Sequence, residues 1–139
     1  MRLVNQRTGD TVASVVEIAA TRATRRKGLL GRASLDPSAA LILSPCFAVH
    51  TAFMQFAIDV AFVSREGVVR KIVSLPPWRM AADVGASAVV EFAAGAARGL
   101  RVGDRIYLSD GSSVPGAVVA SFSCPSLRST ASNPACSGS

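Results

Sequence analysis

The most reactive side chains of this sequence fall in one apolar stretch. His50, the single histidine, is followed by Thr51 and Met54, and Asp59 stands further on between two branched apolar residues. An imidazole held by a carboxylate can act as a general base or bind a ligand. The same pair inside a fold can instead fix the register of two strands. Both interpretations predict that His50 and Asp59 lie within hydrogen-bonding reach, beside a concave site lined by Thr51 and Met54.

The other groups that could do chemistry give weaker signals. Three cysteines, Cys46, Cys124 and Cys136, form an odd set without a CxxC pair. A structural zinc site normally takes four Cys or His ligands, and Cys46 with His50 supplies only two. The chain has no glycine signature for a phosphate or a dinucleotide. We therefore expect no metal site and no cofactor, and we find no complete constellation for nucleophilic catalysis.

Positive charge is concentrated in one short segment. The 139 residues include 15 lysines and arginines against 9 acidic residues, so the net charge is +6. Five cations with no acid among them lie together: Arg22, Arg25, Arg26, Lys27 and Arg32. Such a face can attract phosphate or anionic lipid, and its four arginines form a candidate anion-binding set. A solvated helix face is the simpler interpretation, and so few cations do not predict specific nucleic-acid binding.

The elements that must position these residues are mostly strands. Branched and apolar runs, separated by turns about every eight to twelve residues, are typical of a small β-sandwich or a partly closed barrel. A short helix is expected over 22–27, capped by Thr21, and a second short helix or turn over 93–99. The predicted strands cover residues 2–5, 11–19, 39–43, 48–54, 58–63, 68–74, 86–92 and 105–108. The expected fold class is mainly β (α+β), with one or two short helices.

Three further side chains are expected to have structural roles. Trp78 follows two prolines and is expected to plug one end of the fold, with an exposed position as the alternative. Glu91 lies in an apolar strand and is expected to pair with an arginine, because an isolated buried carboxylate is costly. Asp104 follows a glycine and is expected to hold backbone donors in a turn.

The composition changes after the last predicted strand. Residues 111–139 contain one charged residue, Arg128, and are rich in Ser, Ala, Pro and Gly. Such a segment buries too little apolar surface to offset its ordering entropy. We therefore expect a β-rich domain over 1–110 and an irregular tail over 111–139. The N-terminus lacks the apolar run of a signal peptide, and polar residues interrupt the uncharged stretch 37–58, so a cytoplasmic protein without a membrane span is expected.

Three segments of the sequence contain motifs that resemble those of a known protein family. They are RKGLLGR at 26–32, HTAFMQFAIDVAFVS at 50–64, and an ending that runs from VVE at 89–91 to GDRI at 103–106. Together they resemble the DUF192 (UPF0127) family, with Ala57 in place of a proline and Ser64 in place of an aspartate. The resemblance spans about residues 11–108. It implies a compact, mainly β domain of a prokaryotic family that has no established activity.

Three functions remain open. The first is a non-catalytic binding or accessory module for a small molecule or a protein, using a pocket near His50 and Asp59. The second is an enzyme, hydrolytic in type, with the same two residues as an acid–base couple. The third is an anion-binding module that acts through the basic segment 22–32. Because no catalytic constellation is complete, the first is favoured and an enzyme is not expected.

Overall fold

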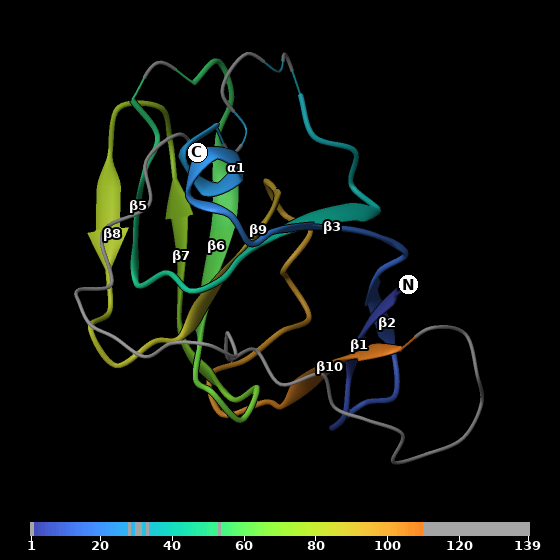
Figure 1. Cartoon of the computed structure of the whole chain (residues 1–139). Coiled ribbons are helices and arrows are strands. Elements are labelled where there is room, and N and C mark those ends of the chain that lie inside the picture. Colours follow the sequence, from blue (N-terminus) through green and yellow to red (C-terminus); the bar gives the residue numbers. More distant parts are fainter. Residues whose placement is uncertain (1, 28, 30–31, 33, 53, 110–139) are drawn as a thin grey trace.

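The chain folds mostly into short strands arranged in three sheets. Figure 1 shows the computed structural model, which describes residues 2–27, 29, 32, 34–52 and 54–109. The expected tail lies outside these residues, so the boundary near residue 110 stays a prediction. No helix in the described ranges is long and apolar enough to cross a membrane.

The largest sheet has five strands in the order β3-β4-β9-β6-β7. These strands are β3 (Val15–Ala19), β4 (Ala39–Leu43), β6 (Ile58–Val63), β7 (Val69–Leu75) and β9 (Ala88–Ala93). β3 and β4 are parallel, and the other neighbours are antiparallel. β4 and β6 are buried along their whole length, and β9 along nearly all of it. Such continuous burial is typical of strands that are covered on both faces.

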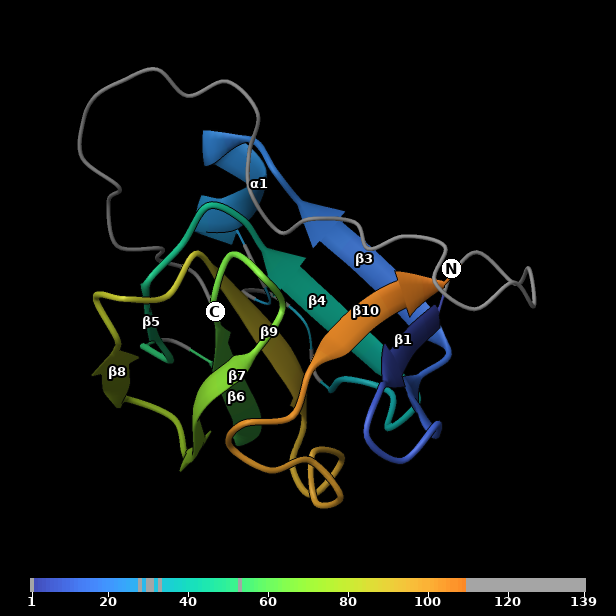
Figure 2. The ribbon, with the colours of Figure 1, turned by 90° about the horizontal axis from the view of Figure 1, so that it is seen from below.

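Different elements cover the two faces of this central sheet (Figures 1 and 2). On one face lies a three-stranded sheet of β1 (Arg2–Asn5), β2 (Thr11–Ala13) and β10 (Ile106–Ser109), in the order β10-β1-β2. On the other face lies a two-stranded ribbon of β5 (Ala48–His50) and β8 (Met80–Ala82). The helix α1 (Arg22–Lys27) leads to Leu29, which packs into the core beneath the ribbon. The result is two apolar cores, one on each side of the central sheet.

The mainly β fold with a short helix over 22–27 is confirmed. β7, β9 and β10 begin or end one or two residues from their predicted bounds, and three differences are larger. The predicted strand 11–19 is split at Ser14, where the chain leaves one sheet and joins another. The backbone N–H of Ser14 donates to the Ser38 carbonyl at 2.8 Å at this point. β5 ends at His50 instead of continuing to residue 54. β8 was not predicted, because the sequence MAA has little strand propensity of its own.

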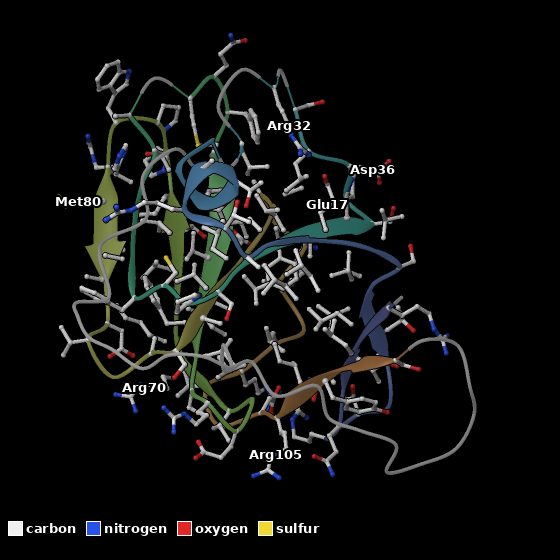
Figure 3. The ribbon with its side chains drawn as sticks, viewed as in Figure 1. Glu17, Arg32, Asp36, Arg70, Met80 and Arg105 are labelled. Carbon is white, nitrogen blue, oxygen red and sulfur yellow. The ribbon has the colours of Figure 1, made fainter. Side chains whose placement is uncertain are left out.

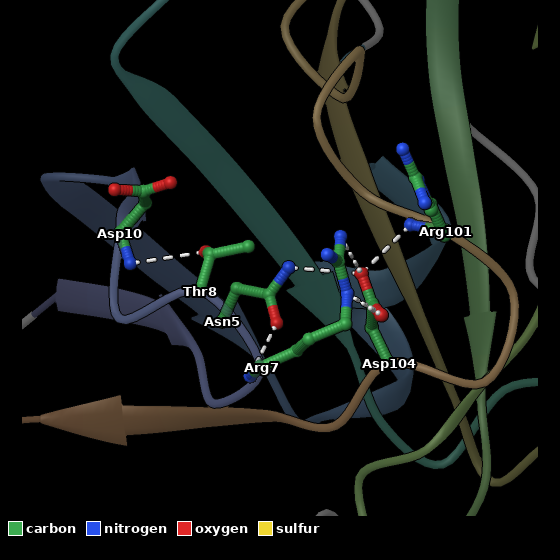
Figure 4. A network of polar contacts seen from close by, with 6 residues as sticks. All are labelled: Asn5, Arg7, Thr8, Asp10, Arg101 and Asp104. Carbon is green, nitrogen blue, oxygen red and sulfur yellow. Dashed lines mark hydrogen bonds and ion pairs between the residues drawn. The ribbon is translucent and has the colours of Figure 1, made fainter.

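Asp104 joins the N-terminal hairpin to the loop before β10 (Figure 4). Its carboxylate accepts hydrogen bonds from Arg7 Nε at 2.6 Å, and from Asn5 Nδ2 and the backbone N–H of Arg101, both at 2.9 Å. These bonds, above all the one from Arg7, lower the pKa of the buried Asp104 carboxyl to about 2. The expectation that Asp104 holds a backbone donor is therefore confirmed.

We predict that Asp104→Asn lowers the free energy of unfolding near pH 7 by about 1–2 kcal/mol, because it removes charge-assisted hydrogen bonds. The folded-state pKa of Asp104 lies below its ordinary value of 3.8. In the wild type this contribution is thus full above about pH 4 and is lost as the pH falls toward about 2. Urea unfolding at several pH values measures both effects. The exposed Asp10, in the same hairpin, supplies the control Asp10→Asn, and an identical pH dependence in wild type and Asp104→Asn would contradict the prediction.

Candidate functional site

The structure does not bring His50 and Asp59 together. His50 ends β5, in the ribbon that covers the central sheet, whereas Asp59 lies in β6 within that sheet. Ile58 and Val60 pack into the core beneath the ribbon, so the residue between them points to the opposite face. The bend between the two strands carries the chain from one layer to the next and leaves Asp59 on the far side. The expected acid–base pair is therefore wrong.

Asp59 has a structural role on the face that it occupies. Its side chain is buried and accepts a hydrogen bond from Ser74 Oγ at 2.9 Å. It also accepts hydrogen bonds from the backbone N–H groups of Gly95 at 2.9 Å and Ala97 at 3.3 Å. The carboxylate thus fixes the turn that follows β9, which corresponds to the short helix or turn predicted over 93–99.

Thr51 clamps the loop that leads into β8. Its side chain is fully buried, and Oγ1 donates to the Pro76 carbonyl at 2.7 Å while it accepts from the backbone N–H of Arg79 at 2.9 Å. Its own backbone N–H donates to the Arg79 carbonyl at 2.7 Å, and its carbonyl accepts from the N–H of Trp78 at 3.0 Å. These contacts join residues far apart in the sequence, and they fix the path of the chain from residue 76 to residue 79.

The clamped loop holds Trp78 in an unusual conformation. Trp78 has a φ of 67°, and among the described residues it is the one non-glycine residue with a positive φ. This left-handed region costs a bulky side chain about 1–3 kcal/mol, so the surrounding contacts must enforce it. The side chain is 59% exposed. The expectation that Trp78 plugs the fold is therefore wrong, and the alternative of a surface position is correct.

Trp78 is the first of four exposed apolar residues at alternate positions. Met80 is 72% exposed and Val84 is 85% exposed, and Ala82 between them is also exposed. We call these four residues the β8 stripe; Figure 3 shows Met80 on the outer side of β8. A strand covering a core normally turns polar residues toward water, whereas the outward positions of β8, Met80 and Ala82, are apolar. Trp78 and Val84 lie in the turns before and after β8. Sequence reasoning missed this stripe, although the alternation in WRMAADV at 78–84 is its signal.

His50 lies on the same face of the ribbon as Met80. It is the register partner of Met80 across the ribbon, and directly paired residues share one face of a sheet. The side chain is partly exposed, and its Nδ1 accepts a hydrogen bond from the backbone N–H of Ala52 at 3.3 Å. Met54, by contrast, is buried in the core beneath the ribbon. Of the predicted pocket residues, His50 alone is thus placed on the surface of the ribbon.

Of the candidate anion-binding arginines that the structure describes, one is exposed and one is already paired with an acidic residue. Arg22 is exposed at the start of α1, while the side chains of Arg25 and Arg26 lie outside the described part of the chain. Arg32 pairs with Glu17 through two hydrogen bonds of 2.9 and 3.0 Å (Figure 3). This ion pair raises the pKa of Arg32 and lowers the pKa of Glu17.

Glu91 is fully buried in the core beneath the ribbon. It lies in β9, where its register partners are Leu41 and Val60. The pKa of Arg32 is raised first by its hydrogen bond to Glu17 and, to a lesser extent, by the negative charge of Glu91. The expected pairing of Glu91 with an arginine stays a prediction. Among the described residues no group of three or more His, Cys, Asp or Glu could hold a metal ion.

The architecture defines a small, mainly β domain with a central sheet covered on both faces. The chain belongs to the DUF192 family, described as Uncharacterized ACR, whose family model matches residues 3–108. A "putative transcription regulator" from Sinorhizobium meliloti 1021 has a similar solved structure, with 22% identity, a TM-score of 0.66, and coverage of 76% of this chain and 88% of that one. A protein of unknown function from Novosphingobium aromaticivorans DSM 12444 is also similar, with 22% identity, a TM-score of 0.65, and coverage of 78% and 84%. None of the curated proteins matches the sequence. The two structural likenesses show the fold alone.

We predict that Thr51→Val releases the loop before β8. Valine keeps the shape of threonine but removes the hydroxyl, so the unfolding free energy should fall by about 1–3 kcal/mol. Trp78 is the single tryptophan, so its fluorescence anisotropy, which should also fall, reports on this loop directly. Thr51→Ser retains the hydroxyl and should stay close to the wild type. Equal anisotropy in the valine and serine variants would contradict the clamp.

A second prediction concerns the separation of Asp59 from the ribbon. Asp59→Asn should destabilise the fold by about 1–2 kcal/mol, because an amide cannot accept hydrogen bonds from all three donors as a carboxylate does. The NMR signals of the Gly95 and Ala97 amides should shift. Those of the His50 imidazole should stay in place, and they are simple to assign because His50 is the single histidine. A change at His50 as large as that at Gly95 would show that the two sites are coupled.

Proposed function

We propose that this protein is a non-catalytic binding module whose binding surface is the outer face of the β5–β8 ribbon. This surface consists of the β8 stripe and His50. The observation that carries the proposal is the exposed Trp78, held in a left-handed conformation by the buried Thr51. Backbone strain of this kind clusters where a side chain must be presented in one orientation.

The β8 stripe also leaves apolar side chains in contact with water, which is unfavourable in addition to the strained backbone of Trp78. Apolar residues scattered singly over a surface need no explanation, but a contiguous row rimmed by polar groups marks an interaction site. Met80 and Ala82 lie in β8, Trp78 and Val84 lie in the turns on either side of it, and all four residues are exposed. A partner that covered this row would remove apolar surface from water, which supplies the main favourable term in most association.

The two other functions are supported less well. An acid–base mechanism needs a carboxylate beside His50, and Asp59 lies on the opposite face of the central sheet. An anion-binding role for the basic segment is weakened because Arg32 is already paired with Glu17. Between the two kinds of ligand for a binding module, a strand face favours a protein over a small molecule, because small molecules bind in concave sites that bury most of their surface.

Photo-crosslinking tests the proposed surface. A photoreactive phenylalanine analogue replaces Met80 in the full chain, and the same analogue replaces Val102 as a control. Val102 is matched in exposure, 64% against 72%, but it lies in the loop before β10 and away from the ribbon. We expect covalent adducts in cells that produce the protein when the probe is at residue 80, and none at residue 102. Adducts at neither position, or equally at both, would refute the binding surface.

A further inference from the structure

Cys46 lies in the core at the point where the chain enters the ribbon. Its side chain is fully buried, just before β5 begins. The backbone N–H of Cys46 donates to the Ser87 carbonyl at 3.1 Å, and Sγ lies 3.2 Å from the carbonyl oxygen of Ala48, the first residue of β5. The sulfur atom therefore has a fixed position in the core beneath the ribbon.

Cys46 forms a disulfide bond. Burial alone would not show this, because an unpaired cysteine behaves as a small apolar residue and is often buried. The chain has three cysteines, and the other two, Cys124 and Cys136, both belong to the segment 111–139. The structure consists of one chain, so the partner of Cys46 is one of these two residues.

We infer that the disulfide of Cys46 attaches the segment 111–139 to the core at the base of the ribbon, through one of the two cysteines of that segment. This covalent site goes beyond the proposed binding surface and does not depend on it. The length of the chain allows the bond. β10 ends at Ser109, and the roughly 15 residues from there to Cys124 reach about 50 Å when extended. A domain of about 110 residues has a radius of gyration of only about 13 Å, so this reach is sufficient.

The bond forms by thiol–disulfide exchange with a small disulfide such as oxidised glutathione. The thiolate of one cysteine attacks the small disulfide, forms a mixed disulfide and releases one reduced glutathione, and the second protein thiolate then displaces the other. The two protein thiols thereby lose two electrons and two protons, which leave as the two thiols of reduced glutathione. Because Cys46 is buried in the folded domain, the exchange takes place before the ribbon closes over it.

The bond has two physical consequences. It closes a loop of about 80–90 residues, which restricts the unfolded chain and stabilises the fold. The buried sulfur of Cys46 is also shielded from external thiols, so reduction requires the ribbon to open first. Disulfides form in oxidising compartments and are rare in the cytosol. The redox state of the surroundings during folding therefore determines whether the segment 111–139 is attached.

Mass spectrometry of a tryptic digest tests the bond directly. The full-length chain is refolded with a mixture of reduced and oxidised glutathione, free thiols are alkylated, and the digest is analysed without reductant. Trypsin cleaves after arginine, so the three cysteines fall in separate peptides, which cover 33–65, 106–128 and 129–139. We expect the peptide 33–65 to be linked to one of the other two, and the link to disappear on reduction.

Thermal unfolding then measures what the bond contributes. The oxidised wild type should melt about 5 °C or more above the reduced wild type. Replacing the bonded tail cysteine by alanine should abolish this difference, whereas replacing the other tail cysteine, the matched control, should preserve it. Both substitutions leave the buried Cys46 in place, so neither opens a cavity at that position in the core. If both variants retain the difference, the inference fails.

Three further results would overturn the inference. One is a digest in which 106–128 is linked to 129–139 while 33–65 carries an alkylated thiol, which would confine the bond to the tail. Another is a link between two molecules, visible as a dimer on a gel without reductant. The third is the absence of any linked peptide after oxidation.

Discussion

The fold depends on covering both faces of the central five-stranded sheet. β4 and β6 are buried along their whole length, so successive residues of each strand belong to different cores. A polar residue inside these strands must find its partners within the layer that it faces. Asp59 finds them in Ser74 and the turn after β9, while Glu91 faces the other core. The two carboxylates are therefore assigned to opposite sides of the molecule by strand geometry alone.

In the β5–β8 ribbon, too, alternate residues face opposite sides, but here one side faces the core and the other faces water. Its inward residues, Val49 and Ala81, pack on the central sheet, and its outward residues include His50 and Met80. Strands of three residues have few hydrogen bonds of their own, so the ribbon depends on a clamp at its end. Thr51 supplies that clamp through its hydroxyl and both of its backbone groups. The same contacts that hold the cover in place therefore also determine how Trp78 is presented.

The central strands could be predicted from the sequence because continuous runs of apolar, branched residues are typical of buried strands. β6 was predicted with its observed bounds, and so was β4. β8 could not be predicted in this way, because it forms only through pairing with β5 and through bonds to Thr51 from residues more than twenty positions away. The pairing of His50 with Asp59 failed for a related reason. Alternation assigns faces within one strand, but it does not tell in which layer the chain continues after a bend.

The two halves of the family motif at 50–64 have different structural roles. Thr51 in its first half orients the loop before β8, and Asp59 in its second half orients the turn after β9; the central sheet lies between them. Both side chains are buried and hydrogen-bonded within their own fold. The exposed apolar residues at the ribbon lie in 78–84, which none of the three family motifs includes, whereas His50 beside them is the first residue of the motif at 50–64. On the proposed binding surface, the exposed side chains of 78–84 can therefore change without altering Thr51 or Asp59, which hold the fold together.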